Sequence, residues 1–310
     1  SGSRQGSGGR SDTKRHSGAS RPFADTLRTN ARHPHSQKNR VVDTVIFKHS
    51  LNRAIYKWRA RRNRDVGQRL RAALNDCTDE IPCFIVCYNN ASHVEQMVVQ
   101  LNQMGVTPIV FDNASTCEQT QSLLKAMHQQ RAYVLRVGRN LRHKVGFLPG
   151  IFEHMPAVFA YTDPDLQFSQ ALPSHFLQTL RDLSREYGVF KAGSALTLNP
   201  DEINRKLTIS KYKSGSMPYQ KAFSVIDWES KYWKFQLQRS DDLTVYAAPL
   251  DTTFAVYNKA NYSGSFMDAV RVAGDYAAIH LPWYPGLDNM EAADRARYLK
   301  RNKSSTWIDN

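Results

Sequence analysis

Uninterrupted apolar runs alternate with amphipathic segments from residue 81 onward. The runs have the length and composition of strands and lie at 81–88, 107–111, 133–137, 157–161 and 189–196. The segments between them repeat apolar residues every three or four positions, as helices do, and lie at 91–104, 118–128, 147–154 and 172–187. Strands that are apolar throughout are typical of parallel sheets covered on both faces. The pattern therefore predicts an α/β fold with a mostly parallel, Rossmann-like sheet flanked by helices.

The pattern is less regular after residue 199. Aromatic residues in 227–235 have helical spacing, and 244–257 reads as a strand broken at Pro249. We place the globular domain at 79–290 and a peripheral C-terminal tail at 291–310.

The first 80 residues differ from the rest in composition. Residues 1–40 are rich in Ser, Gly, Arg and His with almost no large apolar residues, so we expect a disordered basic tail. Residues 41–78 are predicted to form a basic helical extension whose apolar stripe consists of Phe47, Leu51, Ala54, Ile55 and Trp58. Such a helix either packs on the globular domain with its arginines in solvent or contacts an anionic membrane surface through residues 47–74.

The net charge of +14 is concentrated in the same region. Residues 1–80 contain 18 Lys and Arg against 7 Asp and Glu, a net of +11, which leaves +3 for the other 230 residues. The charge of the globular domain therefore gives no indication that this domain binds nucleic acid. No apolar run approaches the roughly 18 to 20 residues that span a bilayer, and the four cysteines form neither a zinc motif nor a disulfide framework. We expect a cytoplasmic protein, peripheral at the membrane if the extension binds lipid.

Two carboxylates one residue apart, Asp163 and Asp165, follow the apolar run at 157–161. The C-terminal edge of such a strand is where open α/β sheets bind ligands. An Asp-x-Asp pair offers hard oxygen ligands to Mg²⁺ or Mn²⁺, with substrate phosphates completing the coordination. The alternative is an Asp-Pro turn that only closes the strand.

Polar residues also end the first two predicted strands. Tyr88-Asn89 ends one, and Asp112-Asn113, followed by Ala114-Ser115, ends the other. Together with the Asp pair, this order over residues 81–170 resembles nucleotide-sugar glycosyltransferases of the GT-A fold, closest to the family-two-like group. The resemblance implies transfer of a sugar from a nucleotide-diphosphate donor to a hydroxyl acceptor such as a glycan or polysaccharide, with Mn²⁺ or Mg²⁺ as cofactor.

The resemblance also implies roles for these strand ends. Tyr88, with Asn89 beside it, would stack on the nucleotide base, and Asp112 or Asn113 would hydrogen-bond the base or ribose. The competing interpretations are a packed aromatic residue for Tyr88 and an Asx turn for Asp112-Asn113.

A basic loop at 138–146 precedes the Asp pair. Four of its side chains are basic or can become so and could offset the charge of a donor diphosphate; they are Arg139, Arg142, His143 and Lys144. The resemblance implies an Asn in this loop, and Asn140 lies there. Solvated loop charges are the alternative.

An isolated histidine, His280, lies in an apolar setting late in the chain. Several GT-A enzymes use a late histidine as a third metal ligand, and an imidazole suits Mn²⁺ better than Mg²⁺. The alternative is a hydrogen-bonded core histidine.

The candidate catalytic base is Asp251, which lies inside an apolar, strand-like stretch. Burial there would raise the carboxyl pKa and make it a better base. Asp227 and Glu229, flanked by aromatic residues, are the next candidates. The Glu-Asp pair that usually supplies the base in the family is not found, which leaves the base and the stereochemical outcome open. Inversion with Asp251 as the base is favoured, and retention is the alternative because late-histidine metal sites also occur in retaining GT-A enzymes.

Two other classes of function are weighed against this hypothesis. A nucleotidyltransferase would need a Gly-rich phosphate loop after the first strand, where the chain has Asn89-Asn90-Ala91-Ser92. A non-enzymatic binder of nucleic acid or an anionic surface would act through residues 1–75.

Overall fold

The computed structural model describes residues 35–128, 131–204, 207–210, 222–301 and 307–309. Its contacts divide the chain into two units, Ser1–Leu51 and Asn52–Asn310. Helix α1 (His35–Asn75) is unbroken from the first unit into the second, and all the strands belong to the second. Most of the predicted tail 1–40 lies outside the described residues.

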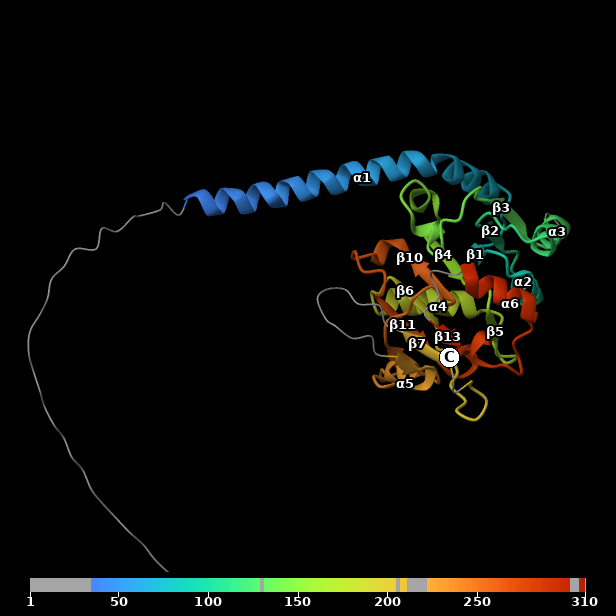
Figure 1. Ribbon diagram of the computed structural model, residues 1–310. Helices are drawn as coiled ribbons and strands as arrows, with labels where there is room; N and C mark the ends of the chain where they lie inside the picture. Colours follow the sequence, from blue (N-terminus) through green and yellow to red (C-terminus); the bar gives the residue numbers. More distant parts are fainter. Residues whose placement is uncertain (1–34, 129–130, 205–206, 211–221, 302–306, 310) are drawn as a thin grey trace, which may run out of the picture. The chain divides into compact units, whose positions relative to one another are not determined.

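An eight-stranded sheet with the order β3-β2-β1-β4-β10-β6-β11-β9 forms the centre of the second unit (Figure 1). Its strands are β1 (Cys83–Cys87), β2 (Ile109–Asp112), β3 (Tyr133–Arg136), β4 (Val158–Thr162), β6 (Lys191–Ser194), β9 (Val245–Ala247), β10 (Ala255–Asn258) and β11 (Ala269–Val272). Strands β3, β2, β1 and β4 are parallel, as are β6 and β11, whereas β10 and β9 run antiparallel to their neighbours. The predicted α/β fold with a mostly parallel sheet is confirmed.

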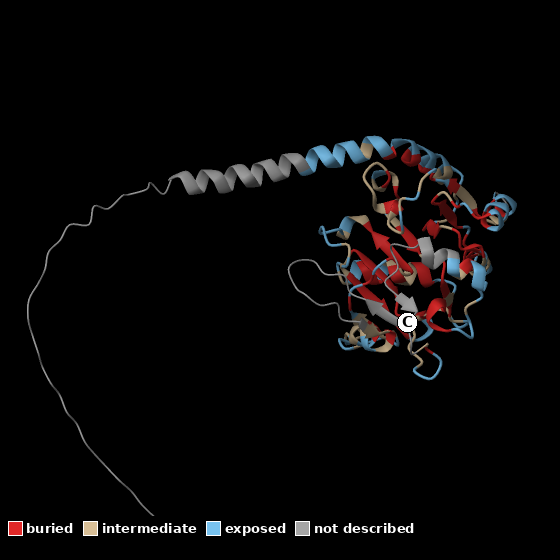
Figure 2. Ribbon diagram, viewed as in Figure 1, coloured by how far each residue is buried: buried red, intermediate tan, exposed pale blue. Residues whose placement is uncertain are grey.

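Both faces of this sheet are covered, which explains the unbroken apolar runs. Successive side chains of a strand point to opposite faces. Ile85 of β1 therefore belongs to a core with α2 (Ala91–Gln103), α3 (Glu118–Met127) and α4 (Phe176–Glu186). Phe84 belongs to a second core, with the C-terminal half of α1 and two 3-10 turns, η1 (Val145–Phe147) and η2 (Phe152–His154). Buried residues accordingly follow the strands in Figure 2.

A two-stranded ribbon joins distant parts of the sequence at the edge of the main sheet. Strand β5 (Leu166–Phe168) pairs antiparallel with β12 (Ala278–His280), which places His280 opposite Leu166. The chain reversal after β4 thus brings the late histidine beside the Asp pair.

The rest of the second half consists of short elements. These are β7 (Leu207–Ser210), β8 (Ala222–Ser224), α5 (Val225–Glu229), η3 (Ser230–Trp233), η4 (Lys259–Asn261), η5 (Gly274–Tyr276), η6 (Leu281–Trp283), α6 (Ala292–Arg301) and β13 (Trp307–Asp309). The predicted tail 291–310 thus contains a helix and a strand, and β13 pairs with β7. No helix in the described part of the chain is both long and apolar enough to cross a bilayer.

Candidate active site

Asp163 and Asp165 lie between β4 and β5, at the C-terminal edge of β4, as the sequence predicted. Asp165 is buried, and its Oδ2 lies 3.5 Å from Nε2 of His280. The Leu281 N–H donates to the Asp165 carbonyl at 2.9 Å, which holds the start of β5 against the end of β12. Asp165 Oδ1 and His280 Nδ1 are both buried without a hydrogen-bond partner. Each of the two residues thus keeps one buried polar atom without a partner, in addition to the pair of atoms in contact.

The Asp163 carboxylate is held by Thr252, a residue that the sequence analysis missed. Thr252 Oγ1 donates to Asp163 Oδ2 at 2.6 Å, and the Asp163 N–H donates to the Thr252 carbonyl at 3.1 Å. Thr252 itself is buried. This reciprocal pair of bonds fixes the side chain and backbone of Asp163 against the loop that precedes β10.

The two carboxyl groups have different proton affinities. Burial and the neighbouring Asp165 charge raise the pKa of Asp163 well above its usual range, despite the hydrogen bond from Thr252. Burial also acts to raise the pKa of Asp165, but His280, through its charge and hydrogen bond, lowers it overall with help from His93. Asp163 therefore holds a proton more readily than Asp165, and a bound cation would compete with that proton.

The predicted metal ligands are brought together only in part. Among the residues that the structure describes, no group of three or more His, Cys, Asp or Glu side chains is arranged to hold a metal ion. Asp165 and His280 are in contact, whereas Asp163 Oδ2 is directed to Thr252. The two unpartnered buried atoms, on a carboxylate and an imidazole, are nevertheless of the types that bind Mn²⁺ or Mg²⁺, so the residues fit such a cation.

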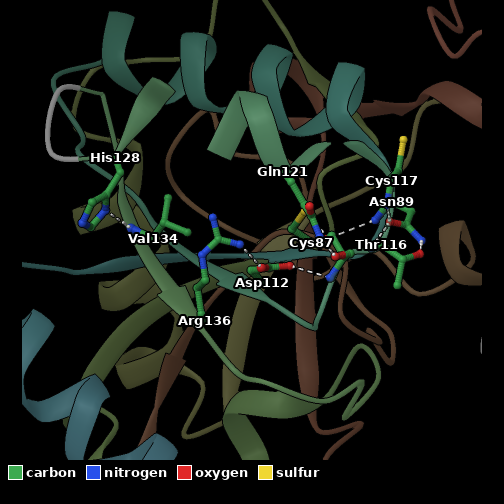
Figure 3. Close-up of polar contacts among 10 residues, drawn as sticks. Cys87, Asn89, Asp112, Thr116, Cys117, Gln121, His128, Val134 and Arg136 are labelled. Atoms are coloured by element: carbon green, nitrogen blue, oxygen red, sulfur yellow. Dashed lines mark hydrogen bonds and ion pairs between the residues drawn. The ribbon is translucent and has the colours of Figure 1, made fainter. Parts of the chain in front are cut away.

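The loops after β1 and β2 are tied together by Asn89 (Figure 3). Its Oδ1 accepts hydrogen bonds from the N–H groups of Thr116, at 2.7 Å, and Cys117, at 2.8 Å. Asn89 has a φ of 54°, in the left-handed region that Asn tolerates better than most residues. Tyr88, before it, is partly buried. Asn89 therefore shapes the edge of the sheet on which Tyr88 lies.

Asp112 at the end of β2 has both carboxylate oxygens occupied. Oδ1 accepts from the Ser115 N–H at 2.8 Å, and Oδ2 lies 2.9 Å from an Arg136 guanidinium nitrogen. Asp112 is almost fully buried. The hydrogen bond reaches the N–H three residues on, one residue further than in an Asx turn, and an ion pair reinforces it. A contact with a nucleotide would therefore have to share these oxygens.

The basic loop 138–146 is fastened to the same edge by two buried side chains. Asn113 accepts from the Leu141 N–H and donates to the Arg142 carbonyl, each at 3.2 Å. Tyr161 of β4 donates its hydroxyl proton to the His143 carbonyl at 2.7 Å. Asn140 caps the turn by accepting from the Arg142 N–H at 2.8 Å. The loop is therefore positioned beside the Asp pair, as the predicted phosphate-binding role requires.

The charged side chains of this loop face different partners. Lys144 Nζ lies 2.9 Å from Asp251 Oδ1, and Arg142 is exposed. Burial lowers the pKa of His143, and its Nδ1 has no hydrogen-bond partner, so this imidazole is neutral at pH 7. Two cations and one neutral imidazole thus lie on the approach to the Asp pair.

The environment predicted for Asp251 is wrong. Strand β9 ends at Ala247, two residues before Pro249, and β10 begins only at Ala255. Asp251 therefore lies in a loop, with 56% of its side chain exposed. It still lies next to Thr252 and hence close to Asp163.

The two other base candidates are engaged elsewhere in the fold. Asp227 is exposed in the first turn of α5, where its carboxylate accepts from the Ser224 hydroxyl at 2.7 Å. Glu229 is buried and forms an ion pair with Arg271. The candidate carboxylate of Glu229 is therefore already paired with a cation.

Two buried cations hold the loop that carries Asp251 and Thr252. Lys191 Nζ donates to the Asp251 carbonyl, and Arg271 Nε donates to the Pro249 carbonyl, each at 2.9 Å. Both residues are at most 5% exposed and lie on the paired strands β6 and β11. The sequence carried a signal for them, since each is a lone cation in an otherwise apolar strand. Their role could not be inferred because the loop that they bind is distant in sequence.

Replacing Lys191 with Met is expected to change how stability depends on pH. Burial lowers the pKa of Lys191 from about 10.5 to about 7, so between these values the unfolded chain binds a proton that the folded chain lacks. Lys191 therefore makes the folded state more stable as pH rises from 7 to 10.5, by up to about 1.4 kcal/mol per pH unit. Denaturant unfolding across this range should give a steeper pH dependence for the unsubstituted protein than for Lys191→Met. Exposed Lys234→Met is the control, and parallel curves for Lys191→Met would contradict the assignment.

Comparison with known proteins finds a weak structural similarity and no similarity in sequence. No known protein family matches this sequence, and no curated protein matches it. Among solved structures, part of the chain is similar to the crystal structure of S. aureus TarS 1–349, a glycosyltransferase, at 12% identity and a TM-score of 0.33. The match covers 59% of this chain and 48% of that one, about half of its length. At this level the similarity carries no information about substrate or chemistry.

Proposed function

We propose that the chain is a metal-dependent glycosyltransferase of the GT-A type that transfers a sugar from a nucleotide-diphosphate donor to a hydroxyl acceptor. The observation that carries this proposal is the contact of Asp165 with His280 at the C-terminal edge of β4, where both residues keep a buried atom without a partner. The ends of β1 and β2 and the basic loop lie at the same edge of the sheet, which supports a donor site there.

Asp165, His280 and Asp163 would hold Mn²⁺ or Mg²⁺. The cation would neutralise the charge that develops on the leaving diphosphate. Arg142 and Lys144 would bind the phosphate oxygens directly, and Tyr88 would face the base. Thr252 keeps Asp163 in place from the opposite side of the pair.

Asp251 is our candidate for the base that accepts the proton of the acceptor hydroxyl in an inverting transfer. Its carboxylate is exposed to solvent and now pairs with Lys144. Binding of a diphosphate by Lys144 would weaken that pair and free the carboxylate, because the phosphate offers the ammonium a second anion. Retention is the alternative outcome, and the anomeric configuration of the product distinguishes the two.

A thermal-shift screen of nucleotide sugars with and without Mn²⁺ tests the assignment. A ligand that binds only the folded state stabilises it by about 2.7 kcal/mol at 100 times its Kd. We expect the unfolding midpoint to rise for at least one nucleotide sugar, and only when Mn²⁺ or Mg²⁺ is present. Midpoints that move with no combination of nucleotide sugar and metal would argue against a donor site.

A further inference from the structure

The part of helix α1 between residues 52 and 59 is exposed on all sides (Figure 2). It includes two large apolar side chains, Ile55 and Trp58, which are 38% and 58% exposed. The helix contacts the rest of its unit through the Tyr56 hydroxyl, which donates to Glu153, and through Asn63 Nδ2, which donates to the Pro149 carbonyl at 2.8 Å. Trp58 precedes Asn63 by five positions and so points about 140° away from it around the helix. Its indole is therefore directed to solvent, not to the core.

The same segment carries a high density of positive charge. Residues 52–75 contain eight Lys and Arg against one acid, Asp65, which pairs with Arg69 at 3.0 Å. The Arg62 guanidinium lies 5.4 Å from the centre of the Trp58 ring. An exposed indole with several cations beside it is typical of helices that lie at the surface of an anionic bilayer.

A groove of about 410 Å³ lies beside this surface. Lys57, Arg61 and Arg64 line one wall, and Gly150, Glu153 and His154 line the other. Glu153 already accepts hydrogen bonds from the Tyr56 hydroxyl and the Gly150 N–H. The groove therefore has three cations and one carboxylate, and both oxygens of that carboxylate already accept hydrogen bonds. This excess of positive charge favours binding of an anionic ligand such as a phosphate.

We propose that this face of α1 docks on an anionic phospholipid bilayer, with Trp58 and Ile55 at the interface and a lipid phosphate in the groove. Trp58 lies between Ile55 and Arg61, about 60° from each around the helix. One membrane surface can therefore reach Ile55, the ring and the edge of the groove at Arg61. A nucleic acid would use the cations and the indole, but it would leave Ile55 in water. The surface is separate from the Asp pair and does not depend on the transfer reaction.

Flotation of the full chain with vesicles tests the proposal. We expect binding to phosphatidylcholine mixed with phosphatidylglycerol and little binding to phosphatidylcholine alone. The double substitution Lys57→Gln/Arg61→Gln should weaken binding by about 30-fold, because two basic groups near the surface are lost. Trp58→Ala should weaken it by about tenfold through lost apolar burial. Brominated lipids should quench the fluorescence of the unsubstituted protein more than that of Trp58→Ala.

The control variant is Lys125→Gln/Arg185→Gln, which lacks two exposed cations elsewhere on the protein. It should bind vesicles as strongly as the unsubstituted protein does. These side chains are all at the surface, so unfolding curves are expected to coincide and to exclude misfolding. Absence of binding to the anionic vesicles, or equal binding by Lys57→Gln/Arg61→Gln and the control, overturns the proposal. Binding of single-stranded RNA without binding of vesicles also overturns it and assigns the surface to nucleic acid.

Discussion

The Asp165→Asn variant is expected to bind Mn²⁺ at least about 100-fold more weakly than the unsubstituted protein. Removing a side chain that hydrogen-bonds a metal ligand typically lowers metal affinity by about 10- to 100-fold. Because Asp165 is proposed to bind the metal directly, its removal should have at least the upper effect. The amide keeps the size of the side chain but removes its negative charge. Asp165 Oδ1 has no hydrogen-bond partner to lose, and the amide oxygen of Asn can still accept from His280 in place of Oδ2. The free energy of unfolding without metal should therefore change by no more than about 1 kcal/mol.

Calorimetric titration with Mn²⁺ alone measures this effect without knowledge of the donor. Asp275→Asn, an exposed carboxylate outside the site, is the matched control and should retain full affinity. An Asp165→Asn variant that still binds Mn²⁺ as the control does would place the metal elsewhere. Loss of Mn²⁺ binding combined with intact stability would support the metal site even before a nucleotide sugar is identified.

The first half of the sheet could be predicted from the sequence because each strand there is defined by residues close together in the chain. Strands β1 to β4 are apolar up to their C-terminal residues, as both faces of the sheet are covered, and each is followed by its own amphipathic helix or turn. The polar residue that ends each strand then falls at one edge of the sheet, since neighbouring parallel strands end together. Asp163 and Asp165 were located by this reasoning alone.

The second half could not be predicted because its pairings are distant in sequence. Strand β10 enters the sheet antiparallel between β4 and β6, and this pairing sets Thr252 beside Asp163. Asp251 illustrates the error that follows: the stretch around it is apolar, but Pro249 and the short strands leave it in an exposed loop. An apolar neighbourhood in the sequence does not establish burial when the partner strand is unknown.

His280 could be singled out by type but not by position. Its approach to Asp165 depends on the β5–β12 ribbon, which joins residues more than 100 positions apart. For Glu229 the residue type was misleading. Its acidic side chain suggested a catalytic base, whereas the fold pairs it with Arg271 of strand β11. Residue type therefore predicts possible chemistry, and long-range pairing decides which residues can take part.

The largest effect on stability is expected for Arg271→Met. Arg271 and Glu229 are both almost fully buried, and removing one partner of a buried ion pair typically costs about 3 to 5 kcal/mol. The substitution also leaves the Pro249 carbonyl without the Arg271 donor, so the loop that carries Asp251 and Thr252 is expected to loosen. Denaturant unfolding should report the lost free energy.

The pH dependence of this variant separates a broken ion pair from a simple loss of packing. Burial raises the pKa of Glu229 and Arg271 opposes that rise, so without Arg271 the folded-state pKa should increase further. The folded variant then holds a proton that the unfolded chain releases, and its stability should fall as pH rises above the unfolded value of about 4.3. The double substitution Glu229→Gln/Arg271→Met removes the unpaired charge and should recover most of the loss. If the single and double variants lose equal stability at every pH, the pair contributes packing alone and the electrostatic account of this loop is wrong.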